Sequence, residues 1–238
     1  MQGKLVVTDM EGFAPTALVV GGFGALGAAI AAQLEADGAR VLRTSRNPPT
    51  GTPEAITLDG DDASRELPTL QAVVWAQGVN VNDRADAHES EDLSRMFDVN
   101  VALVARQLQA LIAGKRLVRG ARLVVLSSIW EGVARPGKFS YTVSKAAVGG
   151  LVRAAALDLA PQGILVNAVL PGVVDTPMTR TMLSTGQIDQ VESATGFRRM
   201  VVPGDVASLV GYLCSPRNTG VTGQSIVVDL GFSVGHLV

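Results

Sequence analysis

The sequence predicts an α/β protein built on one doubly wound parallel sheet of about seven strands, with helices on both faces. Three observations support this class. Short aliphatic runs alternate with longer helical stretches along the 238 residues. The composition is 47% hydrophobic but only 4% aromatic, as expected for aliphatic strands buried between helices. A glycine-rich turn follows the first aliphatic run and precedes the first helical stretch.

Seven aliphatic runs, many rich in β-branched residues, are expected to form the strands. Strands buried on both faces show near-continuous apolar runs because side chains on neither face point to water. Their alternation with helical stretches predicts right-handed βαβ units. The runs are 17–20, 40–44, 55–58, 72–76, 123–127, 164–170 and 225–229.

Four stretches between these runs have helical character and clear end signals. Gly38 is placed to cap the end of the first, Pro161 stops the third, and Pro203 opens the fourth. The polar stretch 176–201 has weak periodicity, and we expect an irregular substrate flap there. No linker or repeat divides the sequence, which favours one domain over residues 1–238. The helical stretches are 25–36, 93–113, 140–160 and 205–214.

Charge and composition exclude several function classes. The chain has 20 basic and 22 acidic residues, so no basic excess favours a nucleic-acid partner. Two histidines and one cysteine are too few for a Cys/His zinc site, and we expect no metal and no histidine base. The uncharged stretch 12–34 is long enough to cross a bilayer. Pro15 and its glycines favour soluble core instead, and we expect a cytoplasmic location.

The turn after the first strand reads Gly21-Gly22-Phe23-Gly24-Ala25-Leu26-Gly27. Glycines at 21, 24 and 27 let the chain turn tightly and bring backbone N–H groups close to a pyrophosphate. The N-terminus of the following helix adds partial positive charge. The position of this turn predicts dinucleotide binding. The alternative is a strand–helix turn that is only closely packed.

The end of the second strand indicates which dinucleotide is bound. In a βαβ dinucleotide fold this point lies beside the adenosine ribose, where a carboxylate binds the 2′-OH and repels a 2′-phosphate. The chain has Ser45 and Arg46 there, so NADP(H) is favoured and NAD(H) stays possible. Arg43 is a second candidate cation. An ordinary solvated charge at Arg46 is the alternative.

Ser128, Tyr141 and Lys145 form the strongest catalytic pattern. Tyr141 and Lys145 are four residues apart, which places them one turn apart on the same helix face. A tyrosine has a pKa of about 10, and lowering it by about three units requires roughly 4 kcal/mol from a nearby ammonium group. Such a pair would move a proton without histidine. A surface Tyr and Lys on an amphipathic helix is the alternative.

These motifs together resemble the short-chain dehydrogenase/reductase family, over residues 16–231. Tyr141-Thr142-Val143-Ser144-Lys145 resembles the family's Y-x-x-x-K, and Ser128 falls at the catalytic serine position. Phe97-Asp98-Val99-Asn100 resembles the segment with the fourth catalytic residue, and Pro171-Gly172-Val173-Val174-Asp175-Thr176 the segment over nicotinamide. Residues 222–224 and 228–231 resemble the final strand region. The resemblance implies a Rossmann-like fold.

The resemblance also implies hydride transfer between NADP(H) and a small-molecule carbonyl or secondary alcohol. Tyr141 would be the acid and base, and Ser128 would hydrogen-bond the substrate oxygen. Lys145 would lower the Tyr141 pKa and bind ribose hydroxyls, while Asn100 would hold a relay water. The expected cofactor contacts are Gly21, Phe23, Gly24, Leu26, Gly27, Ser45, Arg46, Asp59, Ala76, Gln77, Gly78, Asn100, Tyr141, Lys145, Pro171, Gly172, Val174 and Thr176.

The chain departs from the family pattern at Ala25, which replaces a glycine of the commonest phosphate loop. It also has Trp75-Ala76-Gln77-Gly78 where the family usually has N-N-A-G. Two other functions stay open. One is reduction of 3-oxo esters on acyl carrier protein, disfavoured because 157–163 has no basic residue. The other is a sensor or scaffold without turnover. The family implies a homodimer or homotetramer.

Overall fold

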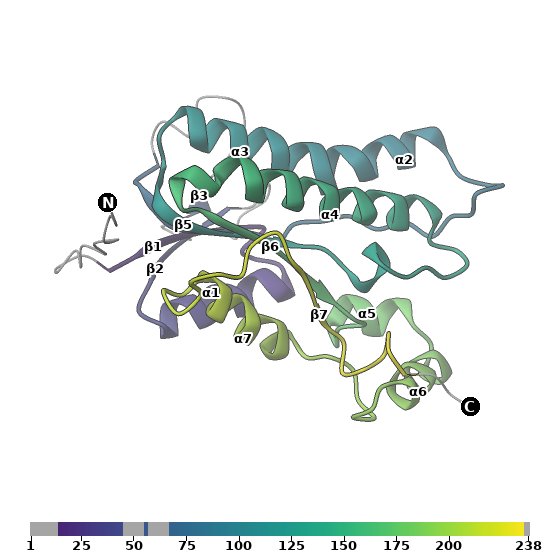
Figure 1. Cartoon of the computed structure of the whole chain (residues 1–238). Helices are drawn as coiled ribbons and strands as arrows, with labels where there is room; N and C mark the ends of the chain where they lie inside the picture. Colours follow the sequence, from purple (N-terminus) through teal and green to yellow (C-terminus); the bar gives the residue numbers. More distant parts are fainter. Residues whose placement is uncertain (1–13, 45–54, 57–66, 236–238) are drawn as a thin grey trace.

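A parallel sheet of seven strands forms the centre of the molecule (Figure 1). The computed structural model describes residues 14–44, 55–56 and 67–235. The strand order is β3-β2-β1-β4-β5-β6-β7, and all adjacent strands are parallel. This order confirms the predicted doubly wound sheet. The strands are β1 Thr16–Val20, β2 Arg40–Thr44, β3 Ala55–Ile56, β4 Leu70–Trp75, β5 Leu117–Leu126, β6 Leu165–Pro171 and β7 Ser225–Val228.

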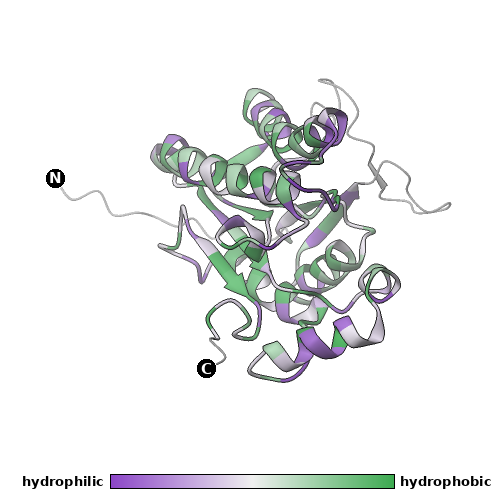
Figure 2. Cartoon of the chain, turned by 90° about the vertical axis from the view of Figure 1, so that its right-hand side faces the viewer, coloured by the Kyte–Doolittle hydropathy of each residue, from purple (hydrophilic) through white to green (hydrophobic). Residues whose placement is uncertain are grey.

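Helices cover both faces of the sheet. Helices α3 and α4 pack on one face and α1 and α7 on the other (Figure 1). The hydropathy colouring of Figure 2 shows largely hydrophobic strands between helices of mixed character. The helices are α1 Ala25–Ala36, α2 Ser90–Phe97, the π-helical η2 Asp98–Ala102, α3 Leu103–Ala113, the 3₁₀ turn η3 Ile129–Glu131, α4 Phe139–Leu159, the 3₁₀ turn η4 Ala160–Gln162, α5 Pro177–Met182, α6 Thr185–Ala194 and α7 Pro203–Cys214.

The side chains of β1 show why its sequence is continuously apolar. Leu18 and Val20 join the core under α3 and α4, whereas Ala17 and Val19 join the core under α1 and α7. Successive residues of a strand point to opposite faces, so both faces of this strand must be apolar. The two cores together therefore hold the sheet between the helix layers.

The chain reverses its direction of travel across the sheet between β1 and β4. From β1 it moves outward to β2 and β3, and then returns to place β4 on the other side of β1. Ligands of open α/β sheets bind in the crevice at the carboxyl ends of strands at such a point. The backbone there is tied together, because the Gly21 amide donates to the Thr44 carbonyl at 3.0 Å and the Ala76 amide to the Val20 carbonyl at 2.8 Å.

Strand β5 begins six residues before the predicted run 123–127, at Leu117. Its pairing with β4 shifts register between Leu70 and Ala72, and Gly120 has a φ of 79°. A bulge of this kind lets an irregular sequence continue a strand. The predicted start of this strand was too late because Arg119 and Gly120 interrupt the apolar run.

The sequence indicated irregular chain at 176–201, and the structure forms helices there instead, while the role as a substrate flap stays a prediction. This stretch contains the helices α5 and α6, each with a side-chain cap at its start. Thr176 accepts a hydrogen bond from the Thr179 amide at 3.2 Å. Ser184 and Gln187 form a capping box before α6. These local caps start helices that are too short to show clear periodicity.

Two apolar stretches raise the question of membrane insertion. The uncharged stretch is divided by the Gly21 turn into β1, a central strand of the sheet, and α1, which packs against the sheet. By length and composition, the 24-residue stretch Ser90–Ala113 could cross a membrane, with 22% of its most apolar window buried. The structure packs this stretch along α4 and buries the polar Asn100 within it.

Candidate active site

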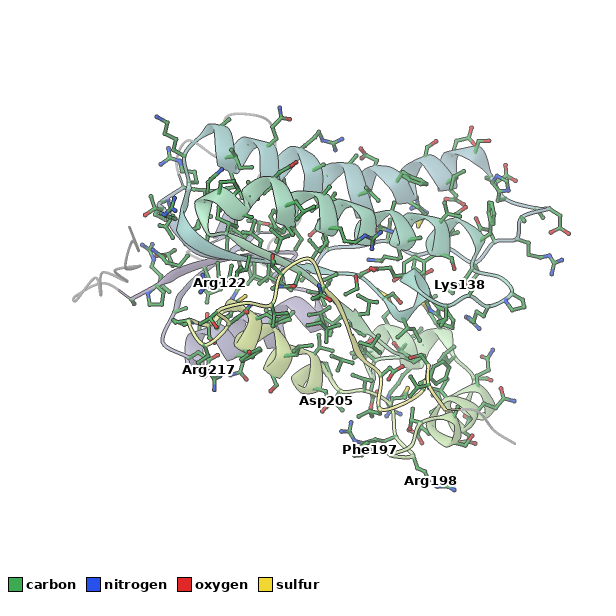
Figure 3. All side chains as sticks on the ribbon, in the orientation of Figure 1. Arg122, Lys138, Phe197, Arg198, Asp205 and Arg217 are labelled. Carbon is green, nitrogen blue, oxygen red and sulfur yellow. The ribbon has the colours of Figure 1, made fainter. Side chains whose placement is uncertain are left out.

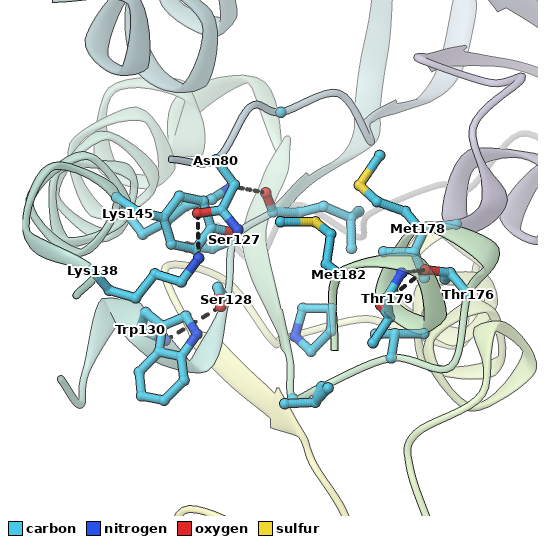
Figure 4. A pocket seen from close by; sticks show the side chains of 18 of the residues that line it. Asn80, Ser127, Ser128, Trp130, Lys138, Lys145, Thr176, Met178, Thr179 and Met182 are labelled. Carbon is cyan, nitrogen blue, oxygen red and sulfur yellow. Dashed lines mark hydrogen bonds between the residues drawn. The ribbon is translucent and has the colours of Figure 1, made fainter. Parts of the chain in front are cut away.

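A cavity of about 410 Å³ opens at the carboxyl ends of the central strands (Figure 4). Ala76 follows β4, Ser127 follows β5 and Gly172 follows β6, and all three line it. The wall also includes Ser128, Tyr141 and Lys145. The cavity therefore brings the predicted catalytic residues to the point where the strand order reverses.

The glycine turn beside this cavity has little room for side chains. Gly21 has a φ of 77°, and a Cβ there would lie 2.9 Å from the Gln77 backbone nitrogen. A Cβ on Gly27 would overlap the Gly21 carbonyl oxygen. Gly24 precedes α1 without a side-chain cap, so the first amides of the helix are open to an anion. Ala25 is exposed as the first residue of α1, so its methyl group does not disturb this turn.

Gln77 gives a second indication of what the cavity holds. Both polar atoms of its side-chain amide are buried and have no hydrogen-bond partner among the described residues. Buried amides are normally satisfied, so an unpaired one in the cavity wall indicates a missing partner with donors or acceptors, which the amide would reach by rotation of its side chain. Gln77 lies between Ala76 and Gly78 on the cavity wall. A dinucleotide, with ribose hydroxyls and phosphates, fits this wall and the glycine turn.

Lys145 and Ser128 reach the cavity from α4 and from the end of β5. Lys145 is 3% exposed, and its ammonium group donates to the Leu126 carbonyl at 3.0 Å. Burial lowers the pKa of Lys145 to about 8, against an opposing effect of the Glu131 carboxylate. Ser128 is also buried, and its hydroxyl accepts a hydrogen bond from the Trp130 amide at 3.3 Å.

The electrostatics of Tyr141 differ from the sequence expectation. Burial raises the pKa of Tyr141 above its usual value, and the hydrogen bond that opposes this rise comes from Ser128. The Lys145 ammonium lies 5.6 Å from the centre of the tyrosine ring and is bonded to Leu126. The expected lowering by Lys145 is thus not achieved by the protein groups alone, because desolvation outweighs the charges nearby.

Asn100 lies in the π-helical segment η2 and holds the backbone of the loop that follows β4. Its side-chain oxygen accepts from the Val79 amide at 2.9 Å, and its nitrogen donates to the Val79 carbonyl at 3.0 Å and to Ser144 Oγ at 3.1 Å. Single turns of π-helix within α-helices are frequent at functional sites. A Cβ on Gly78 would be 3.3 Å from Asn100 Oδ1 and 3.7 Å from Lys145 Nζ. Both groups therefore converge on Gly78. The relay water stays a prediction.

The segment Pro171–Thr176 forms the opposite wall of the cavity. A Cβ on Gly172 would lie 2.8 Å from Asp229 Cβ, which explains a glycine there. Val174 forms an isolated parallel bridge with Val201, and Thr176 caps α5. Pro171, Gly172, Val174 and Thr176 all line the cavity, and their contact with a nicotinamide ring stays a prediction.

Of the remaining predicted cofactor contacts, some line the cavity, some do not, and some lie outside the described residues. Leu26 lines the cavity, while Phe23 is half-buried in the glycine turn and is not part of the cavity wall. Ser45, Arg46 and Asp59 lie outside the described residues. The second candidate cation, Arg43, pairs with Glu35 at 2.7 Å. Its Cβ would lie 2.9 Å from a Cβ on Gly22, so it is beside the glycine turn.

The sequence analysis did not single out Asn80, Arg135 and Lys138, which also line the cavity. Lys138 is buried, and its ammonium group donates to Asn80 Oδ1 at 2.7 Å. Helical spacing gave no signal for Lys138, because it lies just before α4 and outside the predicted helix 140–160.

A glycine turn at the reversal point, an unpaired amide and a Ser–Tyr–Lys set in one cavity define a dinucleotide-dependent oxidoreductase. Comparison with known proteins agrees. A family model described as enoyl-(acyl carrier protein) reductase matches residues 51–233. Cyclopentanol dehydrogenase of Comamonas testosteroni is 33% identical over 191 residues, covering 80% of this chain and 74% of the relative. The chain belongs to the short-chain dehydrogenase/reductase family.

Two further comparisons cover nearly the whole chain. The human dehydrogenase/reductase SDR family member 4 is 29% identical over 240 residues, covering 90% of this chain and 86% of the relative. A short-chain dehydrogenase/reductase structure from Serratia marcescens superimposes with a TM-score of 0.83 at 29% identity. That superposition covers 92% of this chain and 98% of the other. Membership of this family supports a nicotinamide dinucleotide cofactor and a small-molecule substrate.

Proposed function

We propose that this protein transfers a hydride between NADP(H) and a small-molecule ketone or secondary alcohol, with Tyr141 as acid and base. The observation that carries the proposal is the convergence of Ser128, Tyr141 and Lys145 in the cavity beside the glycine turn. The catalytic cavity is contained in one domain, and residues 176–201 close its substrate side.

The bound nicotinamide supplies or accepts the hydride. During reduction, the Ser128 hydroxyl donates a hydrogen bond to the carbonyl oxygen, and the Tyr141 hydroxyl donates its proton as negative charge develops there. During oxidation, the tyrosinate removes the alcohol proton. Lys145 would hold the ribose hydroxyls of the dinucleotide, and its charge favours the tyrosinate against the desolvation that raises the Tyr141 pKa. Asn100 fixes the Val79 backbone and completes a water relay with Lys145.

Replacement of Tyr141 by phenylalanine tests this mechanism. Tyr141→Phe should retain dinucleotide affinity within about twofold but lose at least about 100-fold in turnover, because it removes the proton donor. Tyr212→Phe is the matched control, since Tyr212 is an exposed residue of α7 outside the cavity. Unchanged turnover of Tyr141→Phe over a panel of ketones would refute the assignment. Tight dinucleotide binding without any turnover would favour a sensor or scaffold.

Preference for NADP(H) rests on the residues at the end of β2. No carboxylate follows Thr44 in the sequence Ser45-Arg46, and Arg43 lies beside the glycine turn. Fluorescence titration should show NADPH binding at least about tenfold tighter than NADH, and Arg46→Gln should reduce this difference. Equal affinity for both dinucleotides would reject the preference for NADP(H). If only Arg43→Gln reduced the difference in affinity, Arg43 and not Arg46 would be the residue that binds the 2′-phosphate.

A carrier-bound substrate is the second candidate, favoured by the description of the matching family model. We rank it lower because residues 157–163 offer no cation for an acidic carrier protein. Turnover of a free 3-oxo ester should exceed that of the same acyl group on acyl carrier protein. The opposite order would establish the carrier-bound substrate.

We also propose a cytoplasmic homodimer or homotetramer. Light scattering should give two or four times the chain mass of 24.7 kDa. Cell fractionation should recover the protein without detergent. A monomer mass or a membrane pellet would contradict these two proposals respectively.

A further inference from the structure

The substrate side of the cavity contains two cations that the mechanism does not use. Lys138 and Arg135 both belong to the connection between η3 and α4 and both line the cavity. Figure 3 shows Lys138 just before α4, on the side of the molecule where α5 lies. No aspartate or glutamate is among the described residues that line the cavity. This excess of positive charge stands in a chain whose net charge is −2.

Lys138 is placed close to the reacting centre. Its ammonium group lies 5.6 Å from the centre of the Tyr141 ring, the same separation as that of Lys145. Two ammonium groups therefore flank one tyrosine ring. In Figure 4 the Lys138 side chain runs toward Asn80 on the side of the cavity that carries Ser128 and Trp130.

The Lys138 ammonium lacks a full set of protein partners. The side chain is 5% exposed, and its hydrogen-bond partner within the described residues is the neutral amide of Asn80. Asp83 is near, but one carboxylate oxygen accepts from the Ser140 amide at 3.0 Å and the other has no hydrogen bond. Burial and then Arg135 lower the pKa of Lys138 to about 8, with Asp83 opposing, so the group is still mainly charged at neutral pH. A buried charge of this kind calls for a counter-charge.

Arg135 extends the positive region to the cavity mouth. Its guanidinium carbon lies 5.7 Å from the centre of the Trp130 ring, which holds it over the wall of the cavity. A planar guanidinium binds carboxylate with two parallel hydrogen bonds. The other side of the cavity carries the apolar side chains of Met178 and Met182 beside Thr176 and Thr179 (Figure 4). The substrate side thus combines one charged end with one hydrophobic wall.

We infer that the natural substrate carries a carboxylate close to its reacting carbonyl or alcohol, and that Lys138 and Arg135 bind this carboxylate. The inference rests on the proposed function and names its substrate class, a short oxo acid or hydroxy acid. The carbonyl oxygen meets Ser128 and Tyr141, while the anion meets the two cations. The remaining carbon chain lies along Met178 and Met182.

Matched substrates test this site. A short 2-oxo or 3-oxo acid and its methyl ester are compared with NADPH for wild type, Lys138→Gln and Lys138→Arg. Wild type should prefer the acid, and Lys138→Gln should lower kcat/KM for the acid by about tenfold to hundredfold, the range for a lost charged hydrogen bond. The ester should change by less than about threefold, because it has no charge to bind. Lys138→Arg should recover part of the acid activity.

Lys115→Gln is the control, since Lys115 is exposed in the turn between α3 and β5 and outside the cavity. Arg135→Gln should show a smaller loss on the acid than Lys138→Gln, because Arg135 is more exposed. Preference of wild type for the ester, or an equal loss on acid and ester in Lys138→Gln, would overturn the carboxylate site. Turnover would still be present in either case, so the proposed oxidoreductase function would stand.

A binding measurement keeps the test independent of turnover. The chain has two tryptophans, and Trp130 lines the cavity whereas Trp75 is buried in the core. Malonate titrated into the protein with NADP⁺ should change the Trp130 fluorescence saturably, and the change should be lost in Lys138→Gln and in Trp130→Phe. Inorganic phosphate is the second probe. Tighter binding of phosphate than of malonate would overturn the carboxylate assignment and indicate a substrate that carries a phosphate group. No saturable change with either anion would overturn the inference.

Discussion

Asn100→Ala should destabilise the fold as well as impair activity. Asn100 is 2% exposed, and its amide makes three hydrogen bonds of 2.9, 3.0 and 3.1 Å to the Val79 backbone and Ser144. The variant leaves the partly buried Val79 N–H and C=O without that partner. A buried group left unpaired costs about 1–3 kcal/mol. Partial relaxation of the loop reduces the combined cost of the two unpaired Val79 groups, so we expect a loss of about 2–4 kcal/mol in unfolding free energy.

Urea unfolding followed by circular dichroism measures this loss. With an m-value of about 3 kcal/mol/M, the midpoint should fall by roughly 1 M. Asn82→Ala is the matched control, because Asn82 is exposed on the same loop. Asn100→Asp places a buried carboxylate against the Val79 carbonyl and Ser144 Oγ, where the amide now donates, so its loss should be at least as large as that of Asn100→Ala. A midpoint for Asn100→Ala within about 0.2 M of wild type would refute the reasoning, because it would mean that Val79 finds other partners at no cost.

Three further predictions concern packing, pH and capping. Gly172→Ala should lower stability by about 1–3 kcal/mol in thermal melts, because its Cβ would lie 2.8 Å from Asp229 Cβ; an unchanged melting temperature would contradict this close approach. Because burial lowers the pKa of Lys145 to about 8, the unfolded chain binds more protons between that pKa and its ordinary 10.5. Stability contributed by this residue should therefore rise with pH across that window, and the rise should vanish in Lys145→Met; an equal slope in both proteins would reject it. Ser184→Ala should cost about 1 kcal/mol and speed amide hydrogen exchange in α6 about fivefold, and unchanged exchange would show that the capping box is dispensable.

The sheet was predictable because its signal is local and repeated. Each buried parallel strand must be apolar on both faces, so all seven strands appeared as aliphatic runs, although residues 57–58 of the third run lie outside the described residues. Helix α1 was predicted at its observed bounds, since Gly38, with a φ of 90°, follows it. Strand β5 was predicted too short because its bulge depends on pairing with β4, which the sequence of β5 alone does not reveal.

The candidate site was predictable where spacing alone places residues. Tyr141 and Lys145 are four residues apart on a helix, and Ser128 follows a strand that ends beside it. The π-helical turn at Asn100 was not predictable, because it depends on hydrogen bonds to Val79, 21 residues away. The direction of the Tyr141 pKa shift was also missed, since it depends on burial that only the packed structure shows.

Helix α4 and the strand ends hold the reacting groups, while the connection 132–138 and helix α5 hold the groups expected to choose the substrate. The connection and α5 belong to neither the sheet, the glycine turn nor the helix that carries Tyr141. Natural selection can therefore exchange the charged end or the hydrophobic wall without rebuilding the catalytic centre. The same separation makes these two segments the rational targets for directed evolution toward neutral ketones.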